Sequence, residues 1–204
     1  MPGMPAAAST RLPGRPREFD SELALERALE VFRERGYGGA SIALLGQAMG
    51  LTTGSIYKAY GDKRALFLEA FERYVQARAA DLRQRLETRR SGRERIAATI
   101  DFYLEFSQGI EGLRGCLVAG SAAEARTLDT SMQAIVADAL RRNQAQLEEL
   151  VRQGQADGSV PSRLVPGDAA QALLAFLLGL RVLGKAGHPL HGDALRGLAL
   201  KILD

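Results

Sequence analysis

The sequence contains only one cysteine and two histidines among its 204 residues. A single thiol cannot form a disulfide within the chain, and two histidines cannot build a metal cluster unaided. A disulfide scaffold and a zinc finger are therefore excluded. We expect no metal and no other cofactor.

Long hydrophobic runs are also missing. The most apolar stretch, residues 169–184, is shorter than the roughly 20 residues that a membrane-spanning helix needs, and it contains Gln171 and Arg181. The first 17 residues lack the apolar segment of a signal peptide. We therefore expect a cytoplasmic protein without membrane contact.

The chain has little net charge. Its 27 basic and 24 acidic residues leave a formal charge of +3, which by itself does not identify a nucleic-acid-binding protein. The basic excess lies in residues 1–100, while residues 101–204 hold more acidic than basic groups. With 46% hydrophobic residues, the composition is that of a folded globular protein.

Helical periodicity of apolar residues predicts an all-α fold of about nine helices, with Asp20, Ser41, Thr52 and Asp62 as N-caps and glycines as stops. We predict three short helices in the N-terminal part of the chain and longer ones after them. Their approximate ranges are 20–36, 41–50, 53–60, 62–89, 96–109, 116–126, 129–153, 168–185 and 191–202.

Residues 42–59 have the pattern of a helix-turn-helix. Two helices that cross closely need a small residue at the contact, a turn residue that tolerates a left-handed backbone, and inward apolar residues at fixed offsets. Gly46 is the small residue and Gly50 is at the turn. The apolar positions are Leu45, Met49, Leu51, Ile56 and Ala59.

The outward residues of the second of these helices include no acidic side chain, which suits an approach to DNA phosphates. They are Thr52, Thr53, Gly54, Ser55, Tyr57 and Lys58. Ser41 and Lys63 lie at the N-termini of neighbouring helices, which favour phosphate contacts. The alternative is a helical hairpin whose polar face only meets solvent.

Three segments together resemble the TetR family of bacterial transcriptional regulators: Gly-Arg-Pro-Arg at 14–17, Glu-Arg-Gly-Tyr at 34–37, and SIALLGQAMGLTTGSIYKAYGDKRALF at 41–67. The resemblance covers about residues 14–75. It implies a repressor that leaves its operator DNA when a small-molecule effector binds. It also implies an N-terminal three-helix DNA-binding domain and a C-terminal helical bundle for ligand binding and dimerisation.

We accordingly expect a flexible basic arm at residues 1–17, a helix-turn-helix domain at 18–62, and a ligand-sensing and dimerisation domain at 63–204. In the arm, Arg15 and Arg17 either enter a minor groove or form a solvated tail. The resemblance places the last two helices in a homodimer interface. Residues 169–184 fit this role because they are apolar on nearly every face of a helix, although a central helix of the monomer has the same pattern.

By the same resemblance, Thr52–Ser55 with Tyr57 and Lys58 lie in or beside the recognition helix. Tyr57 can donate a hydrogen bond to a phosphate, Lys58 adds positive charge, and the hydroxyls of Thr53 and Ser55 can contact base edges. Because a hydroxyl pairs with several bases, no operator sequence follows.

The C-terminal half contains apolar residues that either line an effector pocket or form plain core. They are Phe102, Tyr103, Phe106, Cys116, Leu117, Met132 and Phe176. A pocket of these residues implies a largely apolar effector. Cys116, expected at a helix N-terminus beside Arg114, offers an alternative input as a thiol or oxidant sensor, unless it is buried and inert.

Enzymatic activity is not expected. The sequence shows no Ser/His/Asp order, no paired carboxylates in an apolar frame, no phosphate-binding loop and no metal-ligand spacing. Two further alternatives are a helical enzyme with a buried pocket and a helical interaction module that does not bind DNA.

Overall fold

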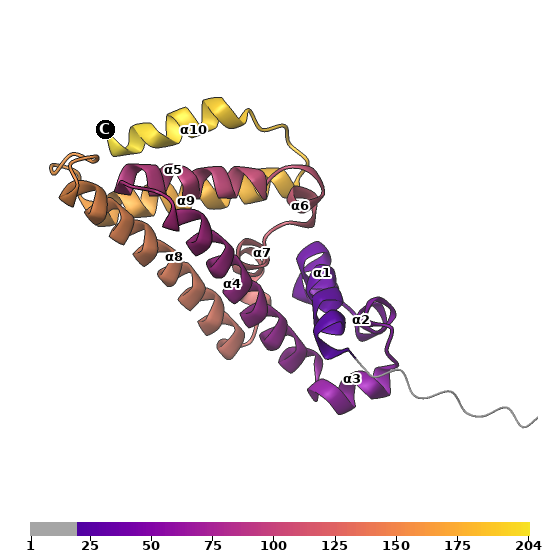
Figure 1. The fold of residues 1–204 in the computed structure, drawn as a ribbon. Helices are drawn as coiled ribbons and strands as arrows, with labels where there is room; N and C mark the ends of the chain where they lie inside the picture. The colour runs from indigo at the N-terminus through magenta and orange to yellow at the C-terminus, as the bar shows by residue number, and fades with distance from the viewer. Residues whose placement is uncertain (1–19) are drawn as a thin grey trace, which may run out of the picture.

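A computed structural model describes residues 20–204, which form ten α-helices, two short 3-10 turns and no strand (Figure 1). The helices are α1 (Ser21–Gly39), α2 (Ile42–Met49), α3 (Thr53–Tyr60), α4 (Lys63–Glu87), α5 (Gly92–Glu105), α6 (Gly109–Arg114), α7 (Leu117–Ala123), α8 (Thr130–Ala156), α9 (Pro166–Lys185) and α10 (Gly192–Leu200). The predicted all-α fold is confirmed.

The four predicted N-caps of the front half are confirmed. Asp20, Ser41, Thr52 and Asp62 each accept a hydrogen bond from the backbone N–H three residues later, at 2.7–3.2 Å. These bonds satisfy amide groups that would otherwise lack a partner in the first turn.

The helix-turn-helix packs as expected at its two glycines. Gly50 adopts a left-handed conformation, with φ 70° and ψ 30°. A Cβ on Gly46 would lie 2.8 Å from the carbonyl oxygen of Leu51, so any larger residue would push the turn away from α2. Leu45, Met49 and Ile56 are buried.

Ala59 does not join this core, contrary to the prediction. It is exposed, because α3 packs inward mainly through Ile56, with Tyr60 half-buried four residues later. Gly36, where α1 was predicted to end, marks a kink with φ 70° rather than the last residue.

Residues 109–114 form the short helix α6, where we predicted a helix end and a glycine-rich turn. The predicted fifth helix instead ends at Glu105. Gly112 packs against the backbone that precedes α6, since a Cβ there would lie 2.5 Å from the Ser107 carbonyl oxygen. A glycine that serves close packing has the same sequence signal as one that ends a helix.

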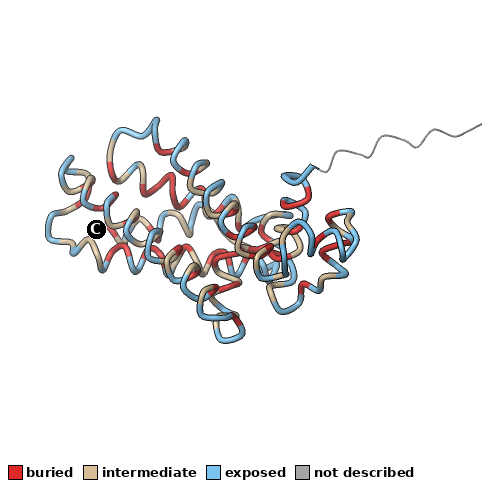
Figure 2. Tube along the Cα trace, turned by 90° about the horizontal axis from the view of Figure 1, so that it is seen from below, coloured by how far each residue is buried: buried red, intermediate tan, exposed pale blue. Residues whose placement is uncertain are grey.

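Two clusters of buried side chains hold the helices together. Figure 2 colours the buried residues red along the Cα trace. The first joins α1–α4 to α7 and the start of α8. The second joins α5, the end of α8, α9 and α10. Helix α4 belongs to both, with Phe67 and Phe71 in the first and Leu82 and Leu86 in the second.

Helix α9 is long and apolar enough to cross a membrane by composition, with a mean hydropathy of 1.4 over its best 18-residue window. In this fold, however, α9 lies against α5 and α8 (Figure 1). Leu173, Leu177 and Leu180 on its inner face are at most 2% exposed. Its apolar character is therefore used, in large part, for the core of the helical domain.

Candidate functional site

The outward face of α3 is a polar surface without acidic groups. All six predicted contact residues are exposed, and Tyr57, the largest, keeps 49% of its surface accessible. They are Thr52, Thr53, Gly54, Ser55, Tyr57 and Lys58. Figure 1 shows α3 at the edge of the molecule, at the end of α4 remote from α10.

Two hydroxyls of this face are held in place by the start of α3. The Thr52 Oγ1 accepts a hydrogen bond from the Ser55 N–H at 3.1 Å and lies 2.9 Å from the Ser55 Oγ. The pair therefore orients the N-terminus of the helix, whose positive dipole end favours a phosphate.

Ser41 and Lys63 flank α3 at the starts of α2 and α4. The Ser41 hydroxyl is exposed and accepts a hydrogen bond from the Leu44 N–H. The Lys63 ammonium lies 4.3 Å from the centroid of the Tyr37 ring, and partial burial lowers its pKa. Arg15 and Arg17, the predicted minor-groove residues, lie outside the described residues.

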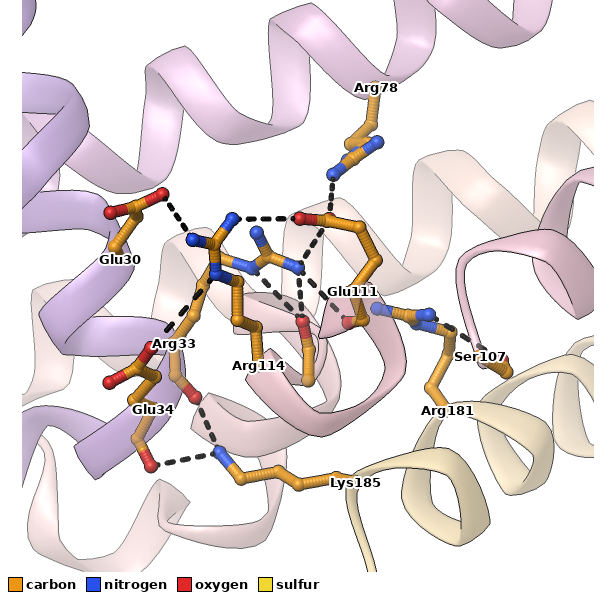
Figure 3. Close-up of polar contacts among 10 residues, drawn as sticks. Glu30, Arg33, Glu34, Arg78, Ser107, Glu111, Arg114, Arg181 and Lys185 are labelled. Carbon is orange, nitrogen blue, oxygen red and sulfur yellow. Dashed lines mark hydrogen bonds and ion pairs between the residues drawn. The ribbon is translucent and has the colours of Figure 1, made fainter. Parts of the chain in front are cut away.

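Arg33 of α1 connects the N-terminal helices to the rest of the chain (Figure 3). Its side chain is 5% exposed. The Nε and Nη2 atoms donate to the Gly115 carbonyl oxygen at 3.0 and 2.9 Å, and Nη2 also lies 2.9 Å from the Glu111 Oε2. Lys185 of α9 donates to the carbonyl oxygens of Arg33 and Glu34.

Glu111 on α6 is shared by three arginines (Figure 3). It pairs with Arg33 at 2.9 Å, with Arg78 of α4 at 3.0 Å and with Arg114 at 3.1 Å. Burial opposes ionisation of the carboxyl, but the hydrogen bond from Arg33 and the surrounding guanidinium charges outweigh it and lower the pKa of Glu111 to about 2. This carboxylate therefore joins α1, α4 and α6.

A cavity of about 70 Å³ lies between α4, α5, α7, α8 and α9. Four predicted pocket residues line it together: Phe102, Tyr103, Phe106 and Cys116. Three others do not. Leu117 and Met132 are buried in the first core cluster, and Phe176 packs against the second.

Sequence reasoning missed the wall that α4 contributes. Tyr74, Arg78 and Leu82 line the cavity at a spacing of four residues, and this helical spacing is the sequence signal that could have identified them. It also missed Arg181, whose charge appeared in the sequence only as an interruption of an apolar run.

Cys116 is the N-cap residue of α7 and is half-buried at the cavity wall. The predicted position at a helix start is confirmed. Tyr74 lies beside it: burial first, and then the Cys116 side chain, raise the pKa of the Tyr74 hydroxyl. Among residues 20–204, no three His, Cys, Asp or Glu side chains gather as a metal site would require.

A helix-turn-helix with an exposed polar second helix, joined through α4 to a larger helical domain, defines a DNA-binding transcriptional regulator. Residues 24–70 match the family model described as bacterial regulatory proteins of the tetR family. Residues 92–191 match the tetracyclin repressor-like C-terminal domain. The chain belongs to the TetR family.

Known proteins agree with this assignment. The uncharacterized HTH-type transcriptional regulator YezE of Bacillus subtilis is 38% identical over 117 residues, 54% of this chain and 57% of that protein. The HTH-type transcriptional repressor BdcR of Escherichia coli is 32% identical over 110 residues, 53% of this chain and 55% of that protein. The chain thus spans little more than half the length of these relatives.

A solved structure matches over nearly the whole chain. It is a cysteine mutant of the TetR family transcriptional regulator CifR, complexed with a 26 bp double-strand operator DNA. The identity is 32% and the TM-score 0.79, with coverage of 93% of this chain and 98% of that chain.

Replacing Lys58 by alanine should weaken binding to operator and unrelated DNA by a similar factor, because a phosphate contact carries no sequence information. The slope of log affinity against log salt concentration should fall by about 1. Fluorescence anisotropy titrations at several salt concentrations measure both. Arg152→Ala, which removes one charge from the surface of α8, is the matched control. An unchanged slope in Lys58→Ala would contradict the placement of Lys58 at a phosphate.

Replacing Glu111 by glutamine should destabilise the fold in a pH-dependent way. The pKa of Glu111 is lowered from 4.5 to about 2 by folding, so its carboxylate stabilises the protein above pH 4.5 and that contribution disappears as the pH falls toward 2. We expect Glu111→Gln to lower the free energy of unfolding by about 1–3 kcal/mol at neutral pH. The difference from wild type should shrink on acidification.

Urea unfolding at successive pH values measures this difference. Glu148→Gln is the control, since Glu148 pairs with Arg152 on the surface of α8, where an ion pair contributes little. If the difference in free energy of unfolding between Glu111→Gln and wild type stays constant down to pH 2, the ionised carboxylate is not the source of the stability.

Proposed function

We propose that this regulator is a repressor, released from double-stranded operator DNA when a small-molecule effector occupies the cavity between α4, α5, α7, α8 and α9. The observation that carries the proposal is the course of α4. Only two residues separate this helix from the end of α3, and Tyr74, Arg78 and Leu82 farther along it line the cavity.

The proposed mechanism is a displacement of α4 that changes the distance between the two recognition helices of a dimer. A ligand shifts such an equilibrium only if it binds the two arrangements with different affinity. Arg78 gives the cavity a route to α1, because it shares the Glu111 carboxylate with Arg33. A ligand that moves Arg78 thereby alters the contact that holds the DNA-binding helices.

The expected homodimer uses α9 and α10. One recognition helix contacts too few base pairs for regulation, so dimers bind half-sites about 34 Å apart. A stripe of exposed apolar or small residues runs along α9, and Leu198 on α10 is 58% exposed. The exposed residues of the α9 stripe are Ala172, Ala175, Val182 and Leu183, with the half-buried Gly179 between them. Burial of this surface against a second copy removes it from water.

The cytoplasm is the proposed site of action, because operator DNA is found there. The relatives are transcriptional regulators, and the polar groups around the cavity do not form a nucleophile with an adjacent base. The proposed role of the cavity is therefore binding rather than catalysis.

Modification of Cys116 is an alternative input. Its half-buried thiol belongs to the cavity wall, beside Tyr74 and at the start of α7. Oxidation or alkylation there adds volume and polarity to the same space. The two inputs differ in their need for the sulfur atom.

An effector found by thermal-shift screening should release the protein from the promoter region beside its own gene in a gel shift. If the effector binds reversibly, Cys116→Ser should respond as wild type does, since binding in the cavity needs no sulfur chemistry. If the thiol is the sensor, Cys116→Ser should lose the response. Salt-insensitive or absent DNA binding would refute the regulator assignment.

The proposed displacement of α4 is tested in the Cys116→Ser variant, which has no native thiol that could take up a spin label. Spin labels on Leu44→Cys, which is exposed on α2, report the separation of the paired DNA-binding domains by pulsed electron paramagnetic resonance. A separation that is identical with and without effector would refute the proposed mechanism.

Val182→Asp should convert the dimer to monomer, because it places an unpaired charge within the proposed apolar interface. The Val182 residue is 59% exposed in the monomer, so the substitution leaves the core intact. Size-exclusion chromatography with light scattering gives the mass. Leu23→Asp, at a 44% exposed position on α1, is the matched control and should remain dimeric. A dimeric Val182→Asp would exclude α9 from the interface.

A further inference from the structure

The effector cavity has an uneven distribution of charge. Its lining includes two arginines, Arg78 and Arg181, and no aspartate or glutamate. The other polar groups include the amides of Asn143 and Gln146 and the hydroxyl of Tyr103, and much of the remaining wall is aromatic or aliphatic. A partly enclosed site with this lining attracts anions and repels cations.

The two arginines differ in how far they are neutralised. Arg78 lies 3.0 Å from the Glu111 carboxylate, and its guanidinium is 3.8 Å from the centroid of the Phe106 ring. Arg181 forms no ion pair with any carboxylate of residues 20–204. Its charge is therefore the one that lacks a counter-ion.

Arg181 is also deeply buried. The residue is 3% exposed, its Nη1 reaches the Ser107 Oγ only at 3.5 Å, and its Nη2 has no hydrogen-bond partner among the described residues (Figure 3). Ser107 lies just beyond the C-terminal end of α5, where the helix dipole supplies roughly half a negative charge. The remaining charge and the free N–H donors suit a carboxylate, which a guanidinium binds in a planar fork.

The size of the cavity limits the ligand. The enclosed volume of about 70 Å³ is about half the roughly 150 Å³ of an apolar cavity that binds benzene, so a bound ring extends into the open mouth of this partly enclosed site. The rings of Phe102 and Phe106 form part of the wall, 4.8 Å apart between centroids. A flat, compact ligand fits such a wall by stacking or edge contacts.

We propose that the cavity binds a compact aromatic carboxylate, with its anionic group on Arg181 and its ring against Phe102 and Phe106. This inference rests on the proposed effector role of the same cavity. It changes the expected chemistry of the effector, which the sequence had indicated to be largely apolar, to an anion with an apolar body.

Isothermal titration calorimetry of the full chain with benzoate and with benzamide tests the proposal, because the two probes have the same shape and differ in charge. We expect benzoate to bind at least about tenfold more tightly at neutral pH. In Arg181→Met that preference should vanish through loss of benzoate affinity, with benzamide unchanged. Arg181→Lys, which keeps the charge without the fork, should retain part of it.

The unliganded Arg181→Met variant should melt at or above the Tm of wild type, since an apolar side chain replaces a buried charge without a counter-ion. Arg152→Met, at a surface position on α8, is the control and should keep the benzoate preference. Equal binding of the two probes, no binding of benzoate, a preference that survives in Arg181→Met, or a clearly lower Tm of that variant would overturn the inference.

Gel shifts separate this inference from the proposed function. Benzoate binding that depends on Arg181 but leaves the DNA complex intact would support the anion site and contradict the effector role. Release of DNA by neutral ligands alone, with no Arg181-dependent benzoate binding, would support the effector role and overturn the anion site.

Discussion

The buried guanidinium of Arg33 holds the DNA-binding helices against the larger helical domain. It belongs to α1, yet its hydrogen bonds go to Gly115 and Glu111, about 80 residues farther along the chain. Burying a charge is costly unless its donors are satisfied, and the Gly115 carbonyl oxygen between α6 and α7 accepts two of the hydrogen bonds that Arg33 donates. The orientation of α1, and with it of α2 and α3, follows from this contact.

The same contact supports the signalling role that we propose for α4. One end of α4 begins next to the recognition helix, and its middle lines the cavity and reaches Glu111 through Arg78. Because three arginines share the Glu111 carboxylate, a change at any one of them alters the electrostatic field at the others. Cavity, α4 and α1 are therefore connected by direct contacts.

Much of the DNA-binding half was predictable from sequence because its signals are local. A cap hydroxyl and the amide that it accepts from are three residues apart, and Gly46 and Gly50 act within a single turn. The errors arose where a signal had two meanings. Gly112 within α6 serves close packing rather than ending a helix, and Ala59 has an inward spacing on a helix too short and peripheral to bury it.

By itself, the sequence determined the all-α fold, the helix-turn-helix, the exposed face of α3 and the aromatic group of α5, since each depends on residues within a few positions of one another. Only the tertiary structure decided which charges meet. Arg33 pairs with Glu111, whereas Arg181 is buried beside Ser107 and forms no ion pair with a carboxylate of residues 20–204. Such pairings depend on how helices pack across distances of some 70 to 80 residues in sequence, and periodicity carries no information about them.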